Sequence, residues 1–456
     1  MQTILPASYN TLKILGTPSE MQGSWRWLKY VVPLEVEDGV LLFNVLTREL
    51  LLASKEEYYN PENFPQFKQK WFRVPKDTDD MEYADGVRFI NKTLHKKSKY
   101  INNYTIFTTT DCNARCFYCY ELGRSRIPMS VETAKKVAEY IASHCDGHAR
   151  LNWFGGEPLY NKEVIDVICK ELKDRGIEYS SSMTTNGYLF DDETIEKAVS
   201  LWKITGMQIT LDGTEEVYNR SKAFIYNDGR SPYQVVMGNI GKILRAGIRV
   251  NIRMNLDNHN SEDLLMLIDE LHNRFAGEKG LRAYSHVLFE FAGETEKIRS
   301  DSERSEIYAK QEIIQNKLDK YGFKAVRKLR KELPVNQCMA DGDNSLTVLP
   351  GGELGRCQHY SENNFVGHIN REEFNQDVLK SFKECYEPIK ECRECFYYPE
   401  CIRLKKCEEQ TMCFKETRQW RKWSILDSMK AAYVTWVKEE KAVNDVEERD
   451  EILREC

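Results

Sequence analysis

The chain has 456 residues, of which 41% are hydrophobic and 30% are charged, and its formal net charge is −6. This balanced composition gives no electrostatic reason to expect nucleic acid or an anionic membrane as a partner. The sequence has no apolar run long enough to cross a bilayer and no signal-like apolar segment at its start, so we expect a cytoplasmic protein. At about 150 residues per domain, the length allows roughly three domains.

Residues 1–95 are typical of a separate small module. Strand-like runs cover 27–32, 39–45 and 49–53, and a turn at Glu37-Asp38-Gly39 joins the first two. Helical runs and a polar stretch follow. Such a module is either a structural extension or a docking domain that adds a peptide strand to an exposed sheet edge.

From residue 104 onward, strand-like segments alternate with amphipathic helices. The strand candidates are 104–109, 150–154, 179–184, 207–211, 249–255 and 284–291. The helix candidates are 131–141, 162–174, 192–202, 233–246 and 262–275. Repeated strand–helix units predict an α/β fold with a parallel sheet and right-handed crossovers. An open doubly wound sheet or a barrel would fit this pattern, and polar motifs at several strand ends favour the barrel.

The fourteen cysteines are unevenly distributed, with three between residues 112 and 119 and eight between residues 338 and 413. In a chain without a signal peptide, such clusters indicate metal ligands before disulfides. Cys112, Cys116 and Cys119 follow the first predicted strand at C-x3-C-x2-C spacing. Three thiolates hold three irons of a [4Fe-4S] cluster and leave the fourth iron open to a substrate or cofactor. A structural zinc site is the alternative.

Polar motifs also follow the next predicted strands. Gly155-Gly156-Glu157-Pro158 combines glycines, which allow close backbone approach, with an acceptor for a cation. Thr184-Thr185-Asn186-Gly187 follows the third strand and Leu211-Asp212-Gly213 the fourth. Arg253 lies on the fifth strand, where it is either a fork-shaped donor for a ligand or an ordinary ion-pairing residue. Taken singly, the Gly155-Gly156-Glu157-Pro158 and Thr184-Thr185-Asn186-Gly187 motifs also fit ordinary turns or loops.

In this order the motifs resemble those of radical S-adenosylmethionine (SAM) enzymes. In that family the open iron binds the amino and carboxylate groups of SAM, an electron cleaves the sulfonium, and the resulting 5′-deoxyadenosyl radical takes a hydrogen atom from the substrate. The resemblance implies a partial (β/α)6 TIM-like barrel and makes Cys112, Cys116 and Cys119 the radical-generating ligands. It also implies that the following residues contact SAM: Tyr118, Gly155, Gly156, Glu157, Thr185, Asn186, Asp212 and Arg253.

One departure from the family pattern follows the Leu211-Asp212-Gly213 segment. The peptide-modifying branch of the family usually continues with a His-Asp pair and a later Arg. Here the corresponding region reads Tyr218-Asn219-Arg220-Ser221-Lys222. Any role of that His or Asp is therefore not carried over to this chain.

A second group of cysteines resembles the SPASM extension of radical SAM enzymes, which holds two auxiliary [4Fe-4S] clusters. The family pattern has seven cysteines, and its counterparts here are Cys338, Cys357, Cys392, Cys395, Cys401, Cys407 and Cys413. Lys405 stands where the family spacing would place a cysteine, so Cys407 is assigned by order. The resemblance implies a distal cluster on Cys392, Cys395, Cys401 and Cys413, and a nearer one on Cys338, Cys357 and Cys407. The fourth position of the nearer cluster is left to Cys385, another ligand or a substrate thiol, and a zinc ribbon is the alternative for Cys392, Cys395 and Cys401.

The resemblance implies a division into a winged-helix-like precursor recognition element of the RiPP (ribosomally made peptide) type, a partial barrel, a helical bridge, a loop-rich SPASM domain and a helical tail. Their expected limits are 1–95, 96–291, 292–337, 338–413 and 414–456. The expected function is a radical SAM oxidoreductase, a RiPP maturase that installs a thioether or carbon–carbon cross-link. Its expected cofactors are SAM and three [4Fe-4S] clusters, and its expected partners are a precursor peptide with a leader and a reductant such as flavodoxin or ferredoxin. The alternatives are a formylglycine-generating sulfatase maturase, a peptide epimerase, and an electron-transfer or scaffold protein with an inactive SAM site.

Overall fold

The computed structural model describes most of the chain. The residues outside the description are 17–22, 96–97, 122, 226–228, 289–298, 324–327, 337, 360–363, 372, 402, 408–412 and 456, together with the side chains of 440–455. None of the described helices is both long and apolar enough to span a membrane.

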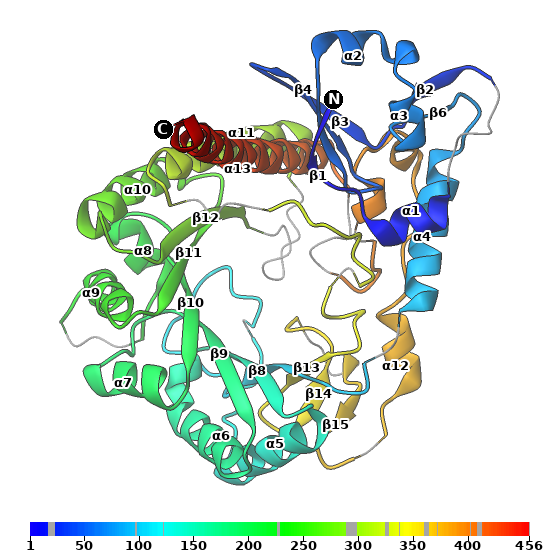
Figure 1. The fold of residues 1–456 in the computed structure, drawn as a ribbon. Helices are drawn as coiled ribbons and strands as arrows, with labels where there is room; N and C mark the ends of the chain where they lie inside the picture. The colour runs from blue at the N-terminus through cyan, green and yellow to red at the C-terminus, as the bar shows by residue number, and fades with distance from the viewer. Residues whose placement is uncertain are drawn as a thin grey trace.

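A curved sheet of nine strands forms the centre of the molecule, in the order β12-β11-β10-β9-β8-β7-β13-β14-β15 (Figure 1). Its first six strands in this order are parallel and confirm the predicted parallel α/β sheet. Their limits are β7 (Asn103–Phe107), β8 (His148–Phe154), β9 (Glu178–Thr185), β10 (Ile204–Thr210), β11 (Arg249–Leu256) and β12 (Leu281–Val287). Residues 289–291 of the last predicted strand lie outside the described part of the chain.

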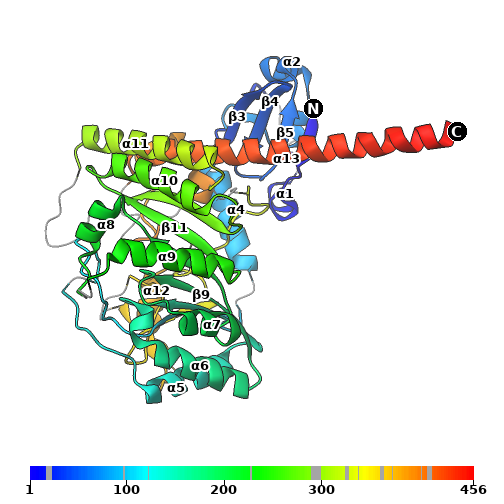
Figure 2. The ribbon, with the colours of Figure 1, turned by 90° about the vertical axis from the view of Figure 1, so that its left-hand side faces the viewer.

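Helices cover the convex face of this sheet (Figures 1 and 2). They are α5 (Val131–His144), α6 (Lys162–Asp174), α7 (Asp192–Ser200), α8 (Glu215–Lys222), α9 (Pro232–Arg245) and α10 (Ser261–Phe275), with the short turn η3 (Pro158–Asn161) before α6. On β9, Tyr179 and Met183 are buried in the core that these helices complete, whereas Ser182 and Thr184 are only partly buried. Because side chains alternate along a strand, the polar ones line the concave face of the barrel.

The sheet continues into the region that was expected to be loop-rich. β13 (Ser345–Val348) pairs in parallel with β7, and β14 (Glu353–Gly355) and β15 (Gly367–His368) follow in antiparallel order. The helix α11 (Asp301–Lys320), within the expected bridge, buries Ile307, Ile314 and Leu318 in the main core. Part of the expected bridge and part of the expected SPASM segment therefore pack as continuations of the barrel.

The N-terminal region forms a four-stranded antiparallel sheet in the order β1-β5-β4-β3 and a two-stranded ribbon of β2 and β6. The strands are β1 (Gln2–Leu5), β2 (Trp25–Trp27), β3 (Val31–Val36), β4 (Gly39–Asn44), β5 (Leu50–Ala53) and β6 (Arg73–Pro75). The helices are α1 (Tyr9–Leu15), α2 (Lys55–Tyr59), η2 (Pro61–Asn63), α3 (Gln66–Gln69) and α4 (Asp80–Leu94). The run predicted as one strand at 27–32 is thus divided between β2 and β3, and the turn at Glu37–Asp38 is confirmed.

This N-terminal region shares a hydrophobic core with segments far along the chain. Tyr30, directly before β3, packs in one cluster with Tyr398 and Met429, and the rings of Tyr30 and Tyr398 are stacked with centroids 6.5 Å apart. Arg48 forms an ion pair with Glu400 in which the arginine side chain is 2% exposed. The N-terminal sheet is thereby fixed against the second cysteine segment.

The remaining elements belong to the C-terminal third of the chain. They are α12 (Gln376–Ser381), the short turns η5 (Lys390–Glu394) and η6 (Tyr398–Glu400), and the long helix α13 (Lys415–Glu455). The first part of α13 contacts α11, β1 and β3, and its C-terminal part extends beyond the rest of the molecule (Figure 2).

Candidate functional site

A cavity of about 380 Å³ lies at the carboxyl ends of the parallel strands. The cysteine loop after β7 forms one wall, and Gln358 and His359, next to Cys357, form part of another. Of the residues predicted to bind a cluster or SAM, it is lined by Cys112, Cys116, Tyr118, Cys119, Gly155, Gly156, Thr185, Asn186 and Arg253.

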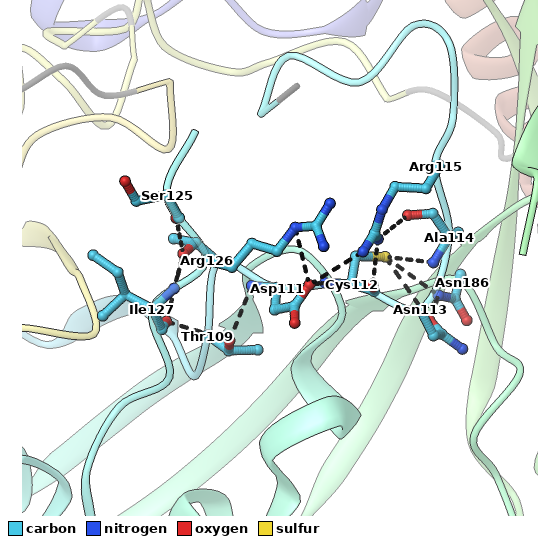
Figure 3. Close-up of polar contacts among 11 residues, drawn as sticks. Thr109, Asp111, Cys112, Asn113, Ala114, Arg115, Ser125, Arg126, Ile127 and Asn186 are labelled. Carbon is cyan, nitrogen blue, oxygen red and sulfur yellow. Dashed lines mark hydrogen bonds and ion pairs between the residues drawn. The ribbon is translucent and has the colours of Figure 1, made fainter. Parts of the chain in front are cut away.

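The start of the cysteine loop is held by its own polar contacts (Figure 3). The Thr109 hydroxyl accepts a hydrogen bond of 2.9 Å from the Asp111 N–H. The Asp111 carboxylate lies 3.6 Å from Arg115 and 3.5 Å from Arg126. These contacts fix the loop where it leaves the strand, and so they fix the direction in which Cys112 points.

The thiols of the loop have donors directed at them. The Cys112 sulfur accepts from the Ala114 N–H at 3.4 Å and from Asn186 Nδ2 at 3.8 Å. Burial raises the pKa of Cys112 to about 12 and that of Cys119 to about 11. Since buried thiolates without a counter-charge are costly, these sulfurs suit a bound metal cluster that supplies positive charge.

The side-chain amide of Asn113, next to the thiols, shows whether the site suits an iron–sulfur cluster. Asn113 is fully buried, its Oδ1 accepts from Asn186 Nδ2 at 2.6 Å, and its Nδ2 has no hydrogen-bond partner among the residues that the structure describes. A buried amide donor is costly to leave unpaired, and hydrogen bonds to cluster sulfurs are a recognised feature of iron–sulfur sites. Sequence reasoning missed Asn113, although it lies between the first two cysteines.

The two glycines after β8 are required by close packing against the cysteine loop. A Cβ on Gly155, whose φ is +133°, would lie 2.1 Å from the Thr109 oxygen, and one on Gly156 would lie 2.4 Å from the Asp111 oxygen. The Gly156 N–H donates to Thr109 O at 3.1 Å, and the next N–H donates to Asp111 O at 2.9 Å. Because glycine has no Cβ, the backbones of the two loops can approach closely enough to form these hydrogen bonds.

Glu157, which was predicted to contact SAM, lies behind the described cavity wall that Thr185 and Asn186 form. Its side chain is fully buried and does not line the described cavity. Its carboxylate accepts from Thr185 Oγ1 and the Asn186 N–H, both at 2.8 Å, and from the Leu159 N–H at 3.1 Å. Burial raises the pKa of Glu157 to about 7, although these hydrogen bonds oppose the shift. The carboxylate therefore holds the Thr185–Asn186 loop in place.

Tyr118, Asp212 and Lys222 form a buried polar group beneath the cysteine loop. Tyr118 donates to Asp212, Lys222 Nζ lies 2.6 Å from the tyrosine hydroxyl and 3.1 Å from the Asp212 carboxylate, and the main-chain oxygen of Lys222 accepts from the Arg115 N–H at 2.8 Å. Burial would lower the pKa of Lys222, but Asp212 and the Cys116 sulfur outweigh it and raise the pKa. Sequence reasoning missed Lys222, which stands in the segment that departs from the family pattern.

Three further residues were predicted to contact SAM. The Thr185 hydroxyl and the Asn186 side chain are engaged with Glu157 and Asn113, respectively, so both residues shape the cavity wall. Arg253 lines the cavity, and its Nε donates to Asn255 Oδ1 at 2.9 Å. Arg253 is therefore a charged donor that faces the cavity.

Among the second group, Cys392, Cys395, Cys401 and Cys413 lie near one another. Charge interactions link Cys395 with each of the other three, and burial raises the pKa of Cys395 and of Cys401. Two arginines of α13 approach the sulfurs, with Arg418 3.4 Å from Cys413 and Arg421 3.8 Å from Cys401. These four are the cysteines expected to hold the distal cluster, and that assignment stays a prediction.

The cysteines expected to hold the nearer cluster are linked less directly. The buried Arg356 guanidinium donates to the main-chain oxygens of Met339 and Ala340, which brings the loop after Cys338 to the residue before Cys357. Cys385 pairs with Leu404 in an isolated β-bridge, which places it beside the segment that leads to Cys407. Within the described residues, no three His, Cys, Asp or Glu side chains converge as ligands of one metal ion.

Comparison with known proteins identifies the domain that carries the cysteine loop. Residues 106–271 match the family model described as Radical SAM superfamily. The GTP 3',8-cyclase of Clostridium perfringens (strain SM101 / Type A) is 25% identical over 316 residues, which cover 63% of this chain and 92% of the cyclase. A probable GTP 3',8-cyclase of Archaeoglobus fulgidus is 29% identical over 180 residues, covering 38% of this chain and 56% of that protein.

Two solved structures show the same fold at low sequence identity. Native anSMEcpe with bound AdoMet (SAM) has a TM-score of 0.54 and 14% identity, over 75% of this chain and all of that one. SuiB of Streptococcus suis bound to precursor peptide SuiA has a TM-score of 0.51 and 11% identity, over 83% of this chain and 94% of SuiB. Residues 106–271 therefore form a radical SAM domain, in a mixed α/β fold with the parallel sheet of a radical SAM barrel.

Proposed function

We propose that this chain is a peptide maturase that uses radical SAM chemistry to form a thioether or carbon–carbon cross-link in a ribosomally made precursor. The observation that carries the proposal is the composition of the main cavity. Its walls combine the Cys112–Cys119 loop with Gln358 and His359, the neighbours of Cys357. A substrate side chain in this cavity would lie between the radical-generating loop and the second cysteine segment.

The chain's own residues would hold the cofactors. Cys112, Cys116 and Cys119 would ligate one [4Fe-4S] cluster, with the Asn113 amide donating to it, and Arg253 would pair with the carboxylate of SAM. When bound, the cluster supplies the electron that cleaves SAM to methionine and the 5′-deoxyadenosyl radical, which abstracts a hydrogen atom. Tyr118, fixed by Asp212 and Lys222, would give the adenine a rigid aromatic neighbour. Gly155 and Gly156 would keep the backbone close to the ligand.

Atoms and electrons balance in the thioether-forming step when the peptide loses two hydrogens. The substrate C–H bond breaks and its hydrogen atom leaves in 5′-deoxyadenosine. The substrate S–H bond breaks, a C–S bond forms, and one proton and one electron leave. An auxiliary cluster would accept that electron. One such cluster would be held by Cys392, Cys395, Cys401 and Cys413, and the other by Cys338, Cys357 and Cys407.

The N-terminal sheet offers a place for the leader of the peptide. β3 is an edge strand that pairs only with β4 in the described sheet. An extended leader could add a strand to such an edge. Since Tyr30, Arg48 and Tyr398 join this sheet to the second cysteine segment, a docked leader would be held at a fixed distance from the cavity.

The test is co-expression with a short, cysteine-rich reading frame from the neighbouring DNA, followed by mass measurement of the peptide. A loss of two hydrogens per site supports a cross-link, and unchanged mass with altered chirality indicates an epimerase instead. An epimerase needs a hydrogen donor at the cavity, and Cys385 does not line the described cavity. Conversion of cysteine to formylglycine would indicate the sulfatase-maturase alternative.

A second candidate function follows from the curated relatives, which are GTP 3',8-cyclases. The observation that favours it is the length of the match, since 316 aligned residues span most of the Clostridium protein. Incubation of the reconstituted chain with GTP, SAM and dithionite tests it. Formation of a cyclised guanosine product would replace the peptide proposal, and unchanged GTP would remove this candidate.

A further inference from the structure

A second cavity, of about 250 Å³, lies at the opposite end of the barrel from the cysteine loop. Its lining is polar and includes Asn152, Ser182, Asn251, Arg249 and Arg282. Thr184 and Gln208 line both this cavity and the one that holds the cysteine loop. The two cavities therefore meet on the concave face of the sheet, and a ligand in the lower one would be continuous with the site of radical formation.

Three arginines are aligned along this concave face. Arg249 and Arg253 are four residues apart on β11, so their side chains point to the same side and their Cα atoms are about 13 Å apart. Arg282 of β12 stands opposite Asn251, midway between them. Arg249 and Arg282 line the lower cavity, and Arg253 lines the upper one. Together they form a row of positive charge that runs through the barrel.

Within the part of the chain that the structure describes, none of these three guanidinium groups has an ion-pair partner, and no carboxylate lines the lower cavity. The Nε atom of Arg249 donates to Thr205 O at 3.2 Å, which leaves its terminal nitrogens for a ligand. Barrel interiors are ordinarily filled by branched apolar side chains. The lower cavity instead presents Arg249 and Arg282 exposed to solvent. Such a pair attracts anions, because the planar guanidinium fork matches carboxylate and phosphate oxygens.

We propose that the lower cavity is an anion-binding subsite that holds a negatively charged part of the substrate while the reacting carbon lies at the cysteine loop. The ligand chemistry is a row of anionic oxygens, either on the phosphates of a nucleotide or on the carboxylates of an extended acidic peptide. In an extended peptide, alternate side chains share one face at about 7 Å spacing, which suits the spacing of these arginines. Assigning the anion to the substrate rests on the proposed function, whereas the subsite itself does not.

Equilibrium binding to the full anaerobic chain, without reductant, tests the subsite. The probes are inorganic tripolyphosphate, GTP, and a short peptide with glutamate at alternate positions. The variant is Arg249→Gln/Arg282→Gln, and the matched control is Arg175→Gln, an arginine on the outer surface that pairs with Glu171 at 3.4 Å. SAM affinity and circular dichroism of each variant show whether the fold and the upper cavity are intact.

The double variant is expected to bind at least one class of probe about tenfold or more weakly, because hydrogen bonds to charged groups are each worth about 1.5–3 kcal/mol. Arg175→Gln is expected to bind like the wild type. Loss confined to tripolyphosphate and GTP identifies phosphate as the anion, and loss confined to the peptide identifies carboxylate. Equal affinities of wild type and double variant, or an equal loss in Arg175→Gln, would overturn the subsite. Since no turnover is required, arginine-dependent binding in an enzyme that modifies no peptide would refute the proposed function alone.

Discussion

The hydroxyl of Tyr118 donates a hydrogen bond to the carboxylate of Asp212, which connects the cysteine loop to the end of β10. Lys222 lies within 3.1 Å of both groups, and the Asp212 and Lys222 side chains are only 3% and 4% exposed. The main-chain oxygen of the same lysine accepts from the Arg115 N–H. One residue of α8 therefore fixes the loop both through its backbone and through its charge.

Substituting Lys222 by methionine should destabilise the fold more than removing both charges. Asp212 would be left as an unpaired buried carboxylate, and breaking a buried pair costs about 3–5 kcal/mol. In Lys222→Met/Asp212→Asn that charge is absent, so we expect a smaller loss of unfolding free energy in urea. Lys222→Arg should preserve most of the stability. If the single and double variants unfold at the same urea concentration, the ion pair does not anchor the loop.

Replacing Cys112, Cys116 and Cys119 together by alanine should remove one cluster. A chain with three clusters binds about twelve irons, and the triple variant should bind about eight. It should also form no 5′-deoxyadenosine from SAM and dithionite. Cys145→Ala, at the end of α5 and away from the cavity, serves as the control and should keep its full iron content. Unchanged iron in the triple variant would place the cluster elsewhere.

Gly156→Ala should weaken cluster and SAM binding, because the new Cβ would lie 2.4 Å from the Asp111 oxygen and displace the cysteine loop. The matched control is Gly238→Ala within α9, where a Cβ meets nothing within 4 Å. That change should stabilise the helix by about 0.5–1 kcal/mol. Iron content, SAM affinity and thermal unfolding of the two variants give the comparison. Equal iron content and SAM affinity would show that the close approach of the two loops is not needed.

The predicted strands and helices of the barrel agree with the structure to within a few residues, because each has a clear apolar period and a polar motif at its end. Of the elements that were missed, two illustrate different reasons. β13 has only four residues and exists through its pairing with β7, far away in the sequence. α8 is mostly polar, and Tyr218 and Lys222 become buried only in the folded chain.

The candidate site was predictable where a motif is local and not where contacts are long-range. The three cysteines and the glycines follow from short strings of sequence. The burial of Glu157 does not, because it depends on Thr185 and Asn186 of the next loop. The packing of the N-terminal sheet against Tyr398 and Met429 could not be predicted either, because a local sequence pattern does not show which distant segments share a core.

The stability of the protein should depend on pH through Glu157. Its pKa is raised in the folded state to about 7 from a usual value near 4.5, so the folded protein binds the proton more tightly than the unfolded chain. The resulting stabilisation is present below about pH 4.5 and is lost as the pH rises through 7. Relative to Glu157→Gln, the unfolding free energy of the wild type should therefore fall by up to about 3 kcal/mol between pH 5 and pH 8, at about 1.4 kcal/mol for each unit of pKa.

Urea unfolding of both proteins at several pH values measures this difference, and other titrating groups cancel because both proteins share them. Glu157→Gln should be less stable than the wild type at pH 5, because its amide places a donor against the Asn186 N–H or the Thr185 hydroxyl. A difference that does not vary with pH would show that Glu157 keeps its ordinary pKa.

Replacing Cys392 and Cys395 by alanine should remove the distal auxiliary cluster and leave the SAM cleavage site intact. We expect about four fewer irons per chain and continued formation of 5′-deoxyadenosine, with loss of cross-linked product. Cys169→Ala, a buried residue of α6 in the main core, is the control for cysteine loss as such. Retention of all iron, or bound zinc in its place, would contradict the auxiliary cluster at this position.

The most direct measurement is anaerobic incubation of the reconstituted chain with SAM, dithionite and the co-encoded peptide, with 5′-deoxyadenosine and peptide mass followed together. The account predicts one 5′-deoxyadenosine for each cross-link and a peptide lighter by two hydrogens, both absent in the Cys112/Cys116/Cys119 variant. Formation of 5′-deoxyadenosine without any change in the peptide, under conditions in which GTP is consumed, would contradict it.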